Sequence, residues 1–166
     1  MKMKRIRRSP RAIPFRKIIP NMITSGNILS GILSMILTLQ GHYHPAAWLI
    51  MAAVFFDAMD GKMARSLGGS TEFGVELDSL ADNVSFGVAP ALVLYMWSLQ
   101  EVPRGGWFAA LAFAVCMALR LARFNARIDL ADEPRKAAGF LTGVPAPVGA
   151  GLAFMPMYLW IQTGEA

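Results

Sequence analysis

The sequence is poor in cysteine and in charged residues, and each shortage excludes a class of protein. Its single cysteine, Cys116, rules out an intrachain disulfide framework, a paired redox motif and a cysteine-rich zinc site. Charged residues make up only 16% of the 166 residues, which is too few to cover an ordinary soluble domain. What fills the sequence instead is apolar: hydrophobic residues make up 55%, and the mean hydropathy is +0.43.

The positive charge is concentrated at one end of the chain. The formal net charge is +5, and eight of the sixteen Lys and Arg residues lie within residues 1–17. This distribution argues against a nucleic-acid partner and predicts a membrane protein that begins with a basic cytoplasmic juxtamembrane segment, residues 1–18. That segment either lies along an anionic lipid surface or serves only to orient the protein.

Five apolar segments each approach the ~20 residues that a helix needs to cross the hydrocarbon core. They occupy residues 20–40, 45–66, 75–98, 107–124 and 143–162. None has the alternating pattern of a strand, and proline or glycine inside a span is tolerated where neighbouring helices surround it. The sequence therefore predicts an all-α fold, a polytopic transmembrane helix bundle.

The basic residues orient these spans. Fifteen of the sixteen Lys and Arg residues fall in alternate connections, and Arg104 alone lies on the other side. The positive-inside rule places the N terminus, the turn at 64–74 and the segment 120–140 in the cytoplasm. We expect an integral, multi-pass membrane protein, in the inner membrane if the source is bacterial.

Four aspartates lie where a membrane helix rarely carries charge. Asp57 and Asp60 are three residues apart on the second span, and Asp78 and Asp82 are four apart on the third, so each pair shares a helix face. A short cytoplasmic turn joins the two spans, so the four carboxylates are expected to converge. An unpartnered acid at a helix centre costs about 2.5–3.5 kcal/mol. Clustered carboxylates call for cations, and all-oxygen ligation suits Mg²⁺, Mn²⁺ or Ca²⁺.

Two other interpretations of the aspartates remain. They can form ion pairs that hold helices together, although few basic residues lie at a matching depth. A divalent-cation transporter also needs intramembrane carboxylates, but its acids or amides are expected to continue to the far side of the membrane.

The sequence around the aspartates resembles the signature of the CDP-alcohol phosphotransferase family. Eight positions match at the family's spacing: Asp57, Asp60, Gly61, Ala64, Arg65, Gly74, Asp78 and Asp82. The resemblance implies a six-helix membrane enzyme, usually a homodimer, that transfers a phosphatidyl or related group from a CDP-linked donor to an alcohol and releases CMP.

The resemblance also implies roles for individual residues. Asp57, Asp60 and Asp78 are expected to bind two divalent cations, Mg²⁺ or Mn²⁺. Asp82 is expected to contact the second cation and to take the proton of the attacking hydroxyl. The CDP site is expected to be lined by Gly61, Arg65 and Thr71.

Further stretches resemble the phosphatidylserine synthase branch of the family. They are residues 20–24, 76–90, 120–125 and 143–147. This resemblance implies CDP-diacylglycerol and L-serine as substrates and phosphatidylserine and CMP as products. The same chemistry with glycerol 3-phosphate or inositol phosphate as acceptor remains the nearest alternative.

Polar residues on the first and fourth spans are candidates for substrate contacts. Arg120, Arg123 and Asn125 are level with the aspartates and are expected to bind the serine carboxylate or the donor phosphate. Asn21, Thr24 and Asn27 either help to bind the cytidine of CDP-diacylglycerol or cap and pack the first helix.

The number of spans departs from the family pattern. The family core has six helices, whereas five spans precede Ala166. We therefore expect residues 19–166 to form a CDP-alcohol phosphotransferase transmembrane domain that is truncated at its C terminus.

Overall fold

The described part of the protein is helical throughout. The computed structural model describes residues 18–66, 71–128 and 144–163, and no strand occurs within them. The helices are α1 (Ile18–Leu39), α2 (Tyr43–Ser66), α3 (Glu72–Asp82), the π-helix η2 (Asn83–Val88), α4 (Ala89–Trp97), the short 3₁₀ helix η3 (Leu99–Glu101), α5 (Gly106–Ile128), α6 (Ala146–Ala153) and α7 (Met155–Thr163). The predicted all-α bundle is confirmed.

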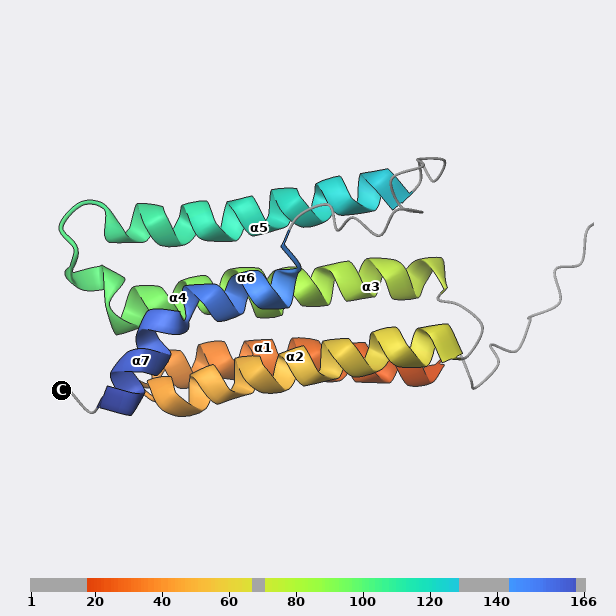
Figure 1. The fold of residues 1–166 in the computed structure, drawn as a ribbon, viewed down its shortest axis with the longest axis horizontal. Coiled ribbons are helices and arrows are strands. Elements are labelled where there is room, and N and C mark those ends of the chain that lie inside the picture. Colours follow the sequence, from red (N-terminus) through yellow and green to blue (C-terminus); the bar gives the residue numbers. More distant parts are fainter. Residues whose placement is uncertain (1–17, 67–70, 129–143, 164–166) are drawn as a thin grey trace, which may run out of the picture.

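The long helices lie side by side, and their connections alternate between the two ends of the bundle (Figure 1). A tight turn joins α1 to α2, where Gly41 has a φ of +79°, a conformation that glycine adopts without strain. The chain passes from α2 to α3 at the opposite end. Helices α1 and α3 therefore run in the same direction, and α3, η2 and α4 form one continuous rod between α1 and α5.

The core of the bundle consists of small and aliphatic side chains. Ala46, Ile50 and Ala53 of α2 are buried together with Phe86 of η2 and Val93 of α4. Alanines at the contact let the helix backbones approach closely, which is how membrane helices gain packing contacts.

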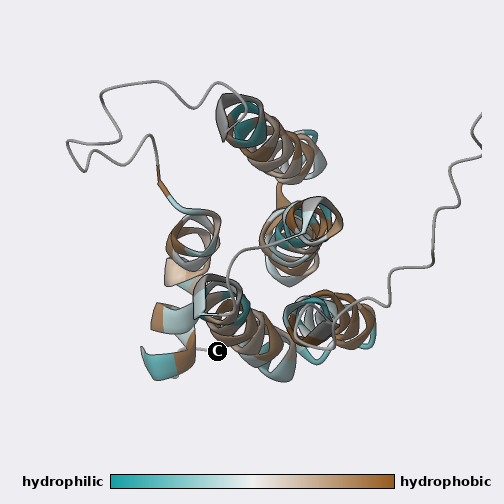
Figure 2. Cartoon of the chain, turned by 90° about the vertical axis from the view of Figure 1, so that its right-hand side faces the viewer, coloured by the Kyte–Doolittle hydropathy of each residue, from teal (hydrophilic) through white to brown (hydrophobic). Residues whose placement is uncertain are grey.

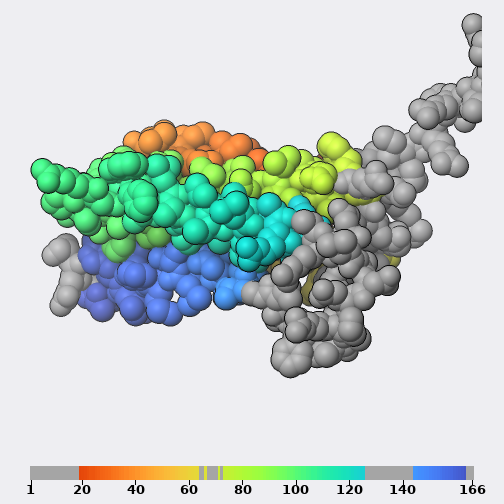
Figure 3. Space-filling model, turned by 90° about the horizontal axis from the view of Figure 1, so that it is seen from above, coloured from red at the N-terminus to blue at the C-terminus, as the bar shows by residue number. Residues whose placement is uncertain are grey.

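Large apolar side chains cover the outside of the bundle, the reverse of a soluble protein. Helix α5 crosses the face seen in Figure 3, and its Trp107, Leu111, Val115 and Leu119 are exposed. The end-on view in Figure 2 shows hydrophobic colour around the outer surfaces of the helices. Three helical stretches are long and apolar enough to cross a membrane: Ile19–Leu39, Phe73–Trp97 and Gly106–Asn125. The protein is therefore an integral membrane protein.

The other two expected spans are helical but differ from a plain apolar span. Helix α2 has 24 residues, and its second half carries the charged residues Asp57, Asp60 and Lys62. The span expected at 143–162 is broken at Phe154 into α6 and α7, and α7 turns away from the line of α6 (Figure 1). The break precedes Pro156, whose ring cannot follow a regular helical turn without displacing the preceding residues.

One face of α1 carries small polar residues into the interior. Thr24, Asn27, Ser34 and Thr38 are all buried. The Ser34 hydroxyl donates to the carbonyl oxygen of Ala46 on α2, at 2.8 Å, and Thr38 donates to the carbonyl oxygen of Ser34 at 2.8 Å. Both bonds satisfy buried hydroxyls, and the Ser34 bond joins α1 to α2.

Candidate functional site

Three aspartates meet at the end of the bundle where α2 passes to α3. Asp57, Asp60 and Asp78 each offer a carboxylate oxygen, and these oxygens lie within 4.8 Å of one another. Asp60 is 4% exposed and the other two are half-buried. The convergence expected from the two pairs is confirmed for these three residues. So many like charges so close together are stable only with a cation between them or a proton shared among them.

Asp82 stands one helical turn beyond Asp78 and is not part of that group of three. Its carboxyl group approaches that of Asp57 across the interface between α2 and α3. One oxygen of Asp82 and one of Asp78 are buried without a hydrogen-bond partner. Buried carboxylate oxygens that lack partners, in an all-oxygen cluster, are the donor set that Mg²⁺, Mn²⁺ or Ca²⁺ requires. The residues present thus fit a divalent-cation site.

Helix α1 supplies a hydrogen bond that fixes the cluster. The Thr24 hydroxyl donates to Oδ2 of Asp60 over 2.8 Å, and both residues are buried. One turn earlier, Asn21 lies close to α3, because a Cβ on Gly74 would be 3.0 Å from its Oδ1. Both residues were candidates for the cytidine site. Thr24 contacts an aspartate directly, and Asn21 lies against α3 one turn before Asp78.

The predicted CDP-binding residues differ in their surroundings. A Cβ on Gly61 would meet no atom within 4 Å, so the backbone beside Asp60 is open to an approaching ligand. Thr71 is the N-cap of α3, and its Oγ1 accepts a hydrogen bond from the backbone N–H of Gly74 at 3.0 Å. The side chain of Arg65 lies outside the described residues.

Helix α5 brings one of its three candidate residues, Asn125, into contact with α3. The Asn125 side-chain amide donates to the hydroxyl of Ser79 at 2.7 Å, between Asp78 and Asp82 on α3. Arg120 is half-buried, and its Nη1 has no hydrogen-bond partner. Arg123 is exposed, and no contact within the described residues joins it to the aspartates.

Sequence reasoning missed two features beside the aspartates. One is Ser79, a residue whose only sequence signal was its position between two aspartates. The other is the π-helix η2, which begins directly after Asp82. Short π-helical segments in longer helices recur at functional sites. Pro90 was the sequence signal for this irregularity, because a proline cannot donate the backbone hydrogen bond that a regular helix makes to residue 86.

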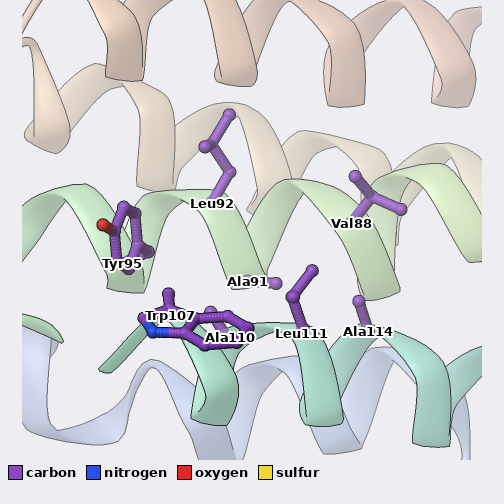
Figure 4. A pocket seen from close by; sticks show the side chains of 8 residues that line it. All are labelled: Val88, Ala91, Leu92, Tyr95, Trp107, Ala110, Leu111 and Ala114. Atoms are coloured by element: carbon purple, nitrogen blue, oxygen red, sulfur yellow. The ribbon is translucent and has the colours of Figure 1, made fainter. Parts of the chain in front are cut away.

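An apolar cavity lies elsewhere in the bundle, between α4 and α5 (Figure 4). Its volume is about 330 Å³. Residues of η2 and α4 face residues of α5 across it: Val88, Ala91, Leu92 and Tyr95 on one side, and Trp107, Ala110, Leu111 and Ala114 on the other. Its lining contains no carboxylate or basic side chain, so it cannot hold a metal ion or a phosphate.

Comparison with known proteins gives consistent matches. A family model described as CDP-alcohol phosphatidyltransferase matches residues 17–165. The chain is 43% identical over 157 residues to a CDP-diacylglycerol–serine O-phosphatidyltransferase of Mycobacterium leprae, covering 95% of this chain and 52% of the relative. It is 34% identical over 142 residues to the Helicobacter pylori protein of the same name, covering 86% of this chain and 58% of the relative.

A third relative, from Bacillus subtilis, has the same name and is 42% identical over 107 residues, which is 64% of this chain and 60% of the relative. The chain spans about half the length of the mycobacterial relatives. The family model covers almost all of it, and three of the four aspartates of the family signature converge in the structure. The chain belongs to the CDP-alcohol phosphatidyltransferase family.

Proposed function

We propose that the protein transfers a phosphatidyl group from CDP-diacylglycerol to L-serine and forms phosphatidylserine and CMP. The observation that carries this proposal is the convergence of Asp57, Asp60 and Asp78 from two helices, beside an open glycine backbone at Gly61. The names of the relatives support serine as the acceptor.

The proposed reaction is a displacement at phosphorus. The serine hydroxyl oxygen forms a bond to the phosphatidyl phosphorus, the bond from that phosphorus to the CMP oxygen breaks, and Asp82 takes the hydroxyl proton. If Asp57, Asp60, Asp78 and Asp82 held two divalent cations, Mg²⁺ or Mn²⁺, those cations would neutralise the diphosphate and stabilise the leaving CMP. Asp82 suits the role of base because it adjoins the cluster while lying outside the group of three.

The substrate contacts follow from the positions of the polar residues. We assign the CDP moiety to the side of the cluster that holds Gly61, Arg65, Thr71, Asn21 and Thr24. The acceptor carboxylate or the donor phosphate is assigned to Arg120 and Asn125, because Arg120 has a buried N–H group without a partner and Asn125 contacts α3. Arg123, which is exposed, is a candidate for an anion at the membrane surface.

The remaining parts of the proposal concern the whole molecule. We place the N terminus and the aspartates on the cytoplasmic side, with residues 1–18 as the basic juxtamembrane segment and residues 19–166 as the catalytic domain. Fifteen of sixteen basic residues support this orientation. A homodimer is proposed from the family resemblance alone.

The test is CMP release by purified protein in lipid micelles that contain CDP-diacylglycerol and Mg²⁺ or Mn²⁺. Serine, glycerol 3-phosphate and inositol phosphate are supplied in parallel. Asp82→Asn is the inactive variant, and Glu101→Gln, an exposed acid on η3 at the other end of the bundle, is its matched control.

We expect CMP release that requires serine, is lost in Asp82→Asn and is unchanged in Glu101→Gln. Release that requires a phosphorylated acceptor would retain the mechanism and refute serine as substrate. Metal binding without CMP release with any acceptor would favour the cation-transporter interpretation.

A further inference from the structure

Asn27 is an unexplained polar group in the interior of the bundle. Its side chain is 0% exposed, and neither Oδ1 nor Nδ2 has a hydrogen-bond partner. Buried amides almost always find partners, so an unpaired one indicates a ligand or water that completes its bonds.

The helix faces place Asn27 beside the acidic cluster. Thr24 and Gly31 lie three residues before and four after it, on the same face of α1. Thr24 contacts Asp60, and a Cβ on Gly31 would lie 2.5 Å from the hydroxyl oxygen of Ser85. The Ser85 hydroxyl itself donates to the backbone oxygen of Asn27 at 3.0 Å.

The parallel course of α1 and α3 fixes the depth of Asn27. Asn21 is level with Gly74, and Gly31 is level with Ser85. Between these two contacts, Asn27 falls opposite the turn that runs from Asp78 to Asp82. Asn27, Asp78 and Asp82 each have a buried polar atom without a partner, and the two contacts put these three residues at a similar depth along the bundle.

This depth is the floor of the site. Asn27 lies six residues deeper than Asn21, about 9 Å along a helix. Just beyond it the backbones of Gly31 and Ser85 are in contact, which closes the space below. A ligand that reaches Asn27 must therefore be small, and the nucleotide end of the donor is better accommodated at the open backbone of Gly61.

We propose that Asn27 determines acceptor specificity by binding the carboxylate or ammonium group of a small hydroxy amino acid. This inference rests on the proposed function and names a residue that selects its acceptor. An amide offers two N–H donors and one oxygen acceptor, which matches a molecule that carries both a carboxylate and an ammonium group. Because the amide is neutral, it does not compensate the net negative charge of an acceptor phosphate, whereas zwitterionic serine has no net charge to compensate, which favours serine over glycerol 3-phosphate.

The test separates the two substrates kinetically. Asn27→Leu replaces the amide with an apolar side chain of similar size, and KM is measured for serine and for CDP-diacylglycerol in turn. The matched control is Thr38→Val, which removes another buried polar group from the same face of α1 at the far end of the helix. KM does not depend on the fraction of protein that folds, so partial misfolding leaves the comparison valid.

We expect Asn27→Leu to raise KM for serine about tenfold, the effect of losing one hydrogen bond to a charged group. KM for CDP-diacylglycerol should change less than about twofold, a free-energy difference below one hydrogen bond. Thr38→Val should leave both constants unchanged. An increase in KM for CDP-diacylglycerol instead would place Asn27 in the donor site and overturn the inference, as would equal effects of the two variants or no effect of Asn27→Leu.

A failure of the proposed function would give a different experimental result from a failure of this inference. Wild-type protein that releases no CMP with serine would refute that function, and this inference with it. Wild-type protein that depends on serine, combined with an Asn27→Leu variant of unchanged KM, would refute the role of Asn27 alone.

Discussion

Thr24→Val removes a single hydroxyl from the acidic cluster and tests whether α1 organises it. The hydroxyl lies 2.8 Å from Oδ2 of Asp60 and 3.0 Å from the carbonyl oxygen of Pro20. Its one proton favours the carboxylate, because hydrogen bonds to charged acceptors are the stronger ones. Valine has nearly the same shape, so the substitution isolates the hydrogen bond from the packing.

The expected magnitude follows from the burial of this bond. Asp60 is 4% exposed, so water cannot easily replace the lost donor. A hydrogen bond to a charged group contributes about 1.5–3 kcal/mol, and 1.4 kcal/mol corresponds to a factor of ten. We therefore expect Thr24→Val to raise the Mn²⁺ concentration needed for half-maximal CMP release by about 10- to 100-fold.

The assay is a Mn²⁺ titration of CMP release by wild type, Thr24→Val and Thr38→Val. The hydroxyl of Thr38 bonds to Ser34 within α1, about 21 Å along the helix from Thr24, so its loss should not alter the response to metal. A Thr24→Val protein with the wild-type Mn²⁺ response would refute the reasoning. So would an equal shift in Thr38→Val, because the effect would then come from α1 in general.

Two glycines give opposite predictions. Gly61→Ala should leave the folded protein as stable as wild type or raise its melting temperature, because a Cβ there meets no atom and alanine favours a helix by roughly 0.5–1 kcal/mol. It should nevertheless raise KM for CDP-diacylglycerol; an unchanged KM would remove Gly61 from the donor site. Gly31→Ala should lower the melting temperature, because its Cβ would lie 3.0 Å from the backbone Cα of Ser85 and force α1 away from η2. A melting temperature equal to that of wild type would show that the contact is not tight in solution.

The local parts of the site could be predicted from the sequence. Spacings of three and four residues place two carboxylates on one helix face whatever the rest of the fold does, so Asp57 could be paired with Asp60 and Asp78 with Asp82. Because a short turn joins the two helices, the two pairs of carboxylates were also expected to converge. The structure bears this out for Asp57, Asp60 and Asp78.

Contacts between helices distant in the sequence could not be predicted in the same way. The hydrogen bonds from Thr24 to Asp60 and from Asn125 to Ser79 depend on how far each helix is rotated and shifted along its neighbour. Those quantities come from the packing of small residues over the whole interface. The exposed position of Arg123 has the same origin, since one residue of rotation decides whether a side chain faces α3 or the lipid.

The π-helix after Asp82 has a consequence for insertions and deletions. A π turn holds one more residue than the α turn that it replaces, and one residue of an α-helix corresponds to a rotation of about 100°. Removing one residue from Asn83–Val88 would therefore restore an unbroken α-helix and leave the helix beyond it in nearly the same rotational position relative to the aspartates. A deletion within the α-helical residues of α3 has no extra residue to absorb it, and it would instead rotate the helix beyond it by about 100°. The π-helix is thus the part of the α3–α4 rod that can lose one residue without turning the faces of α4.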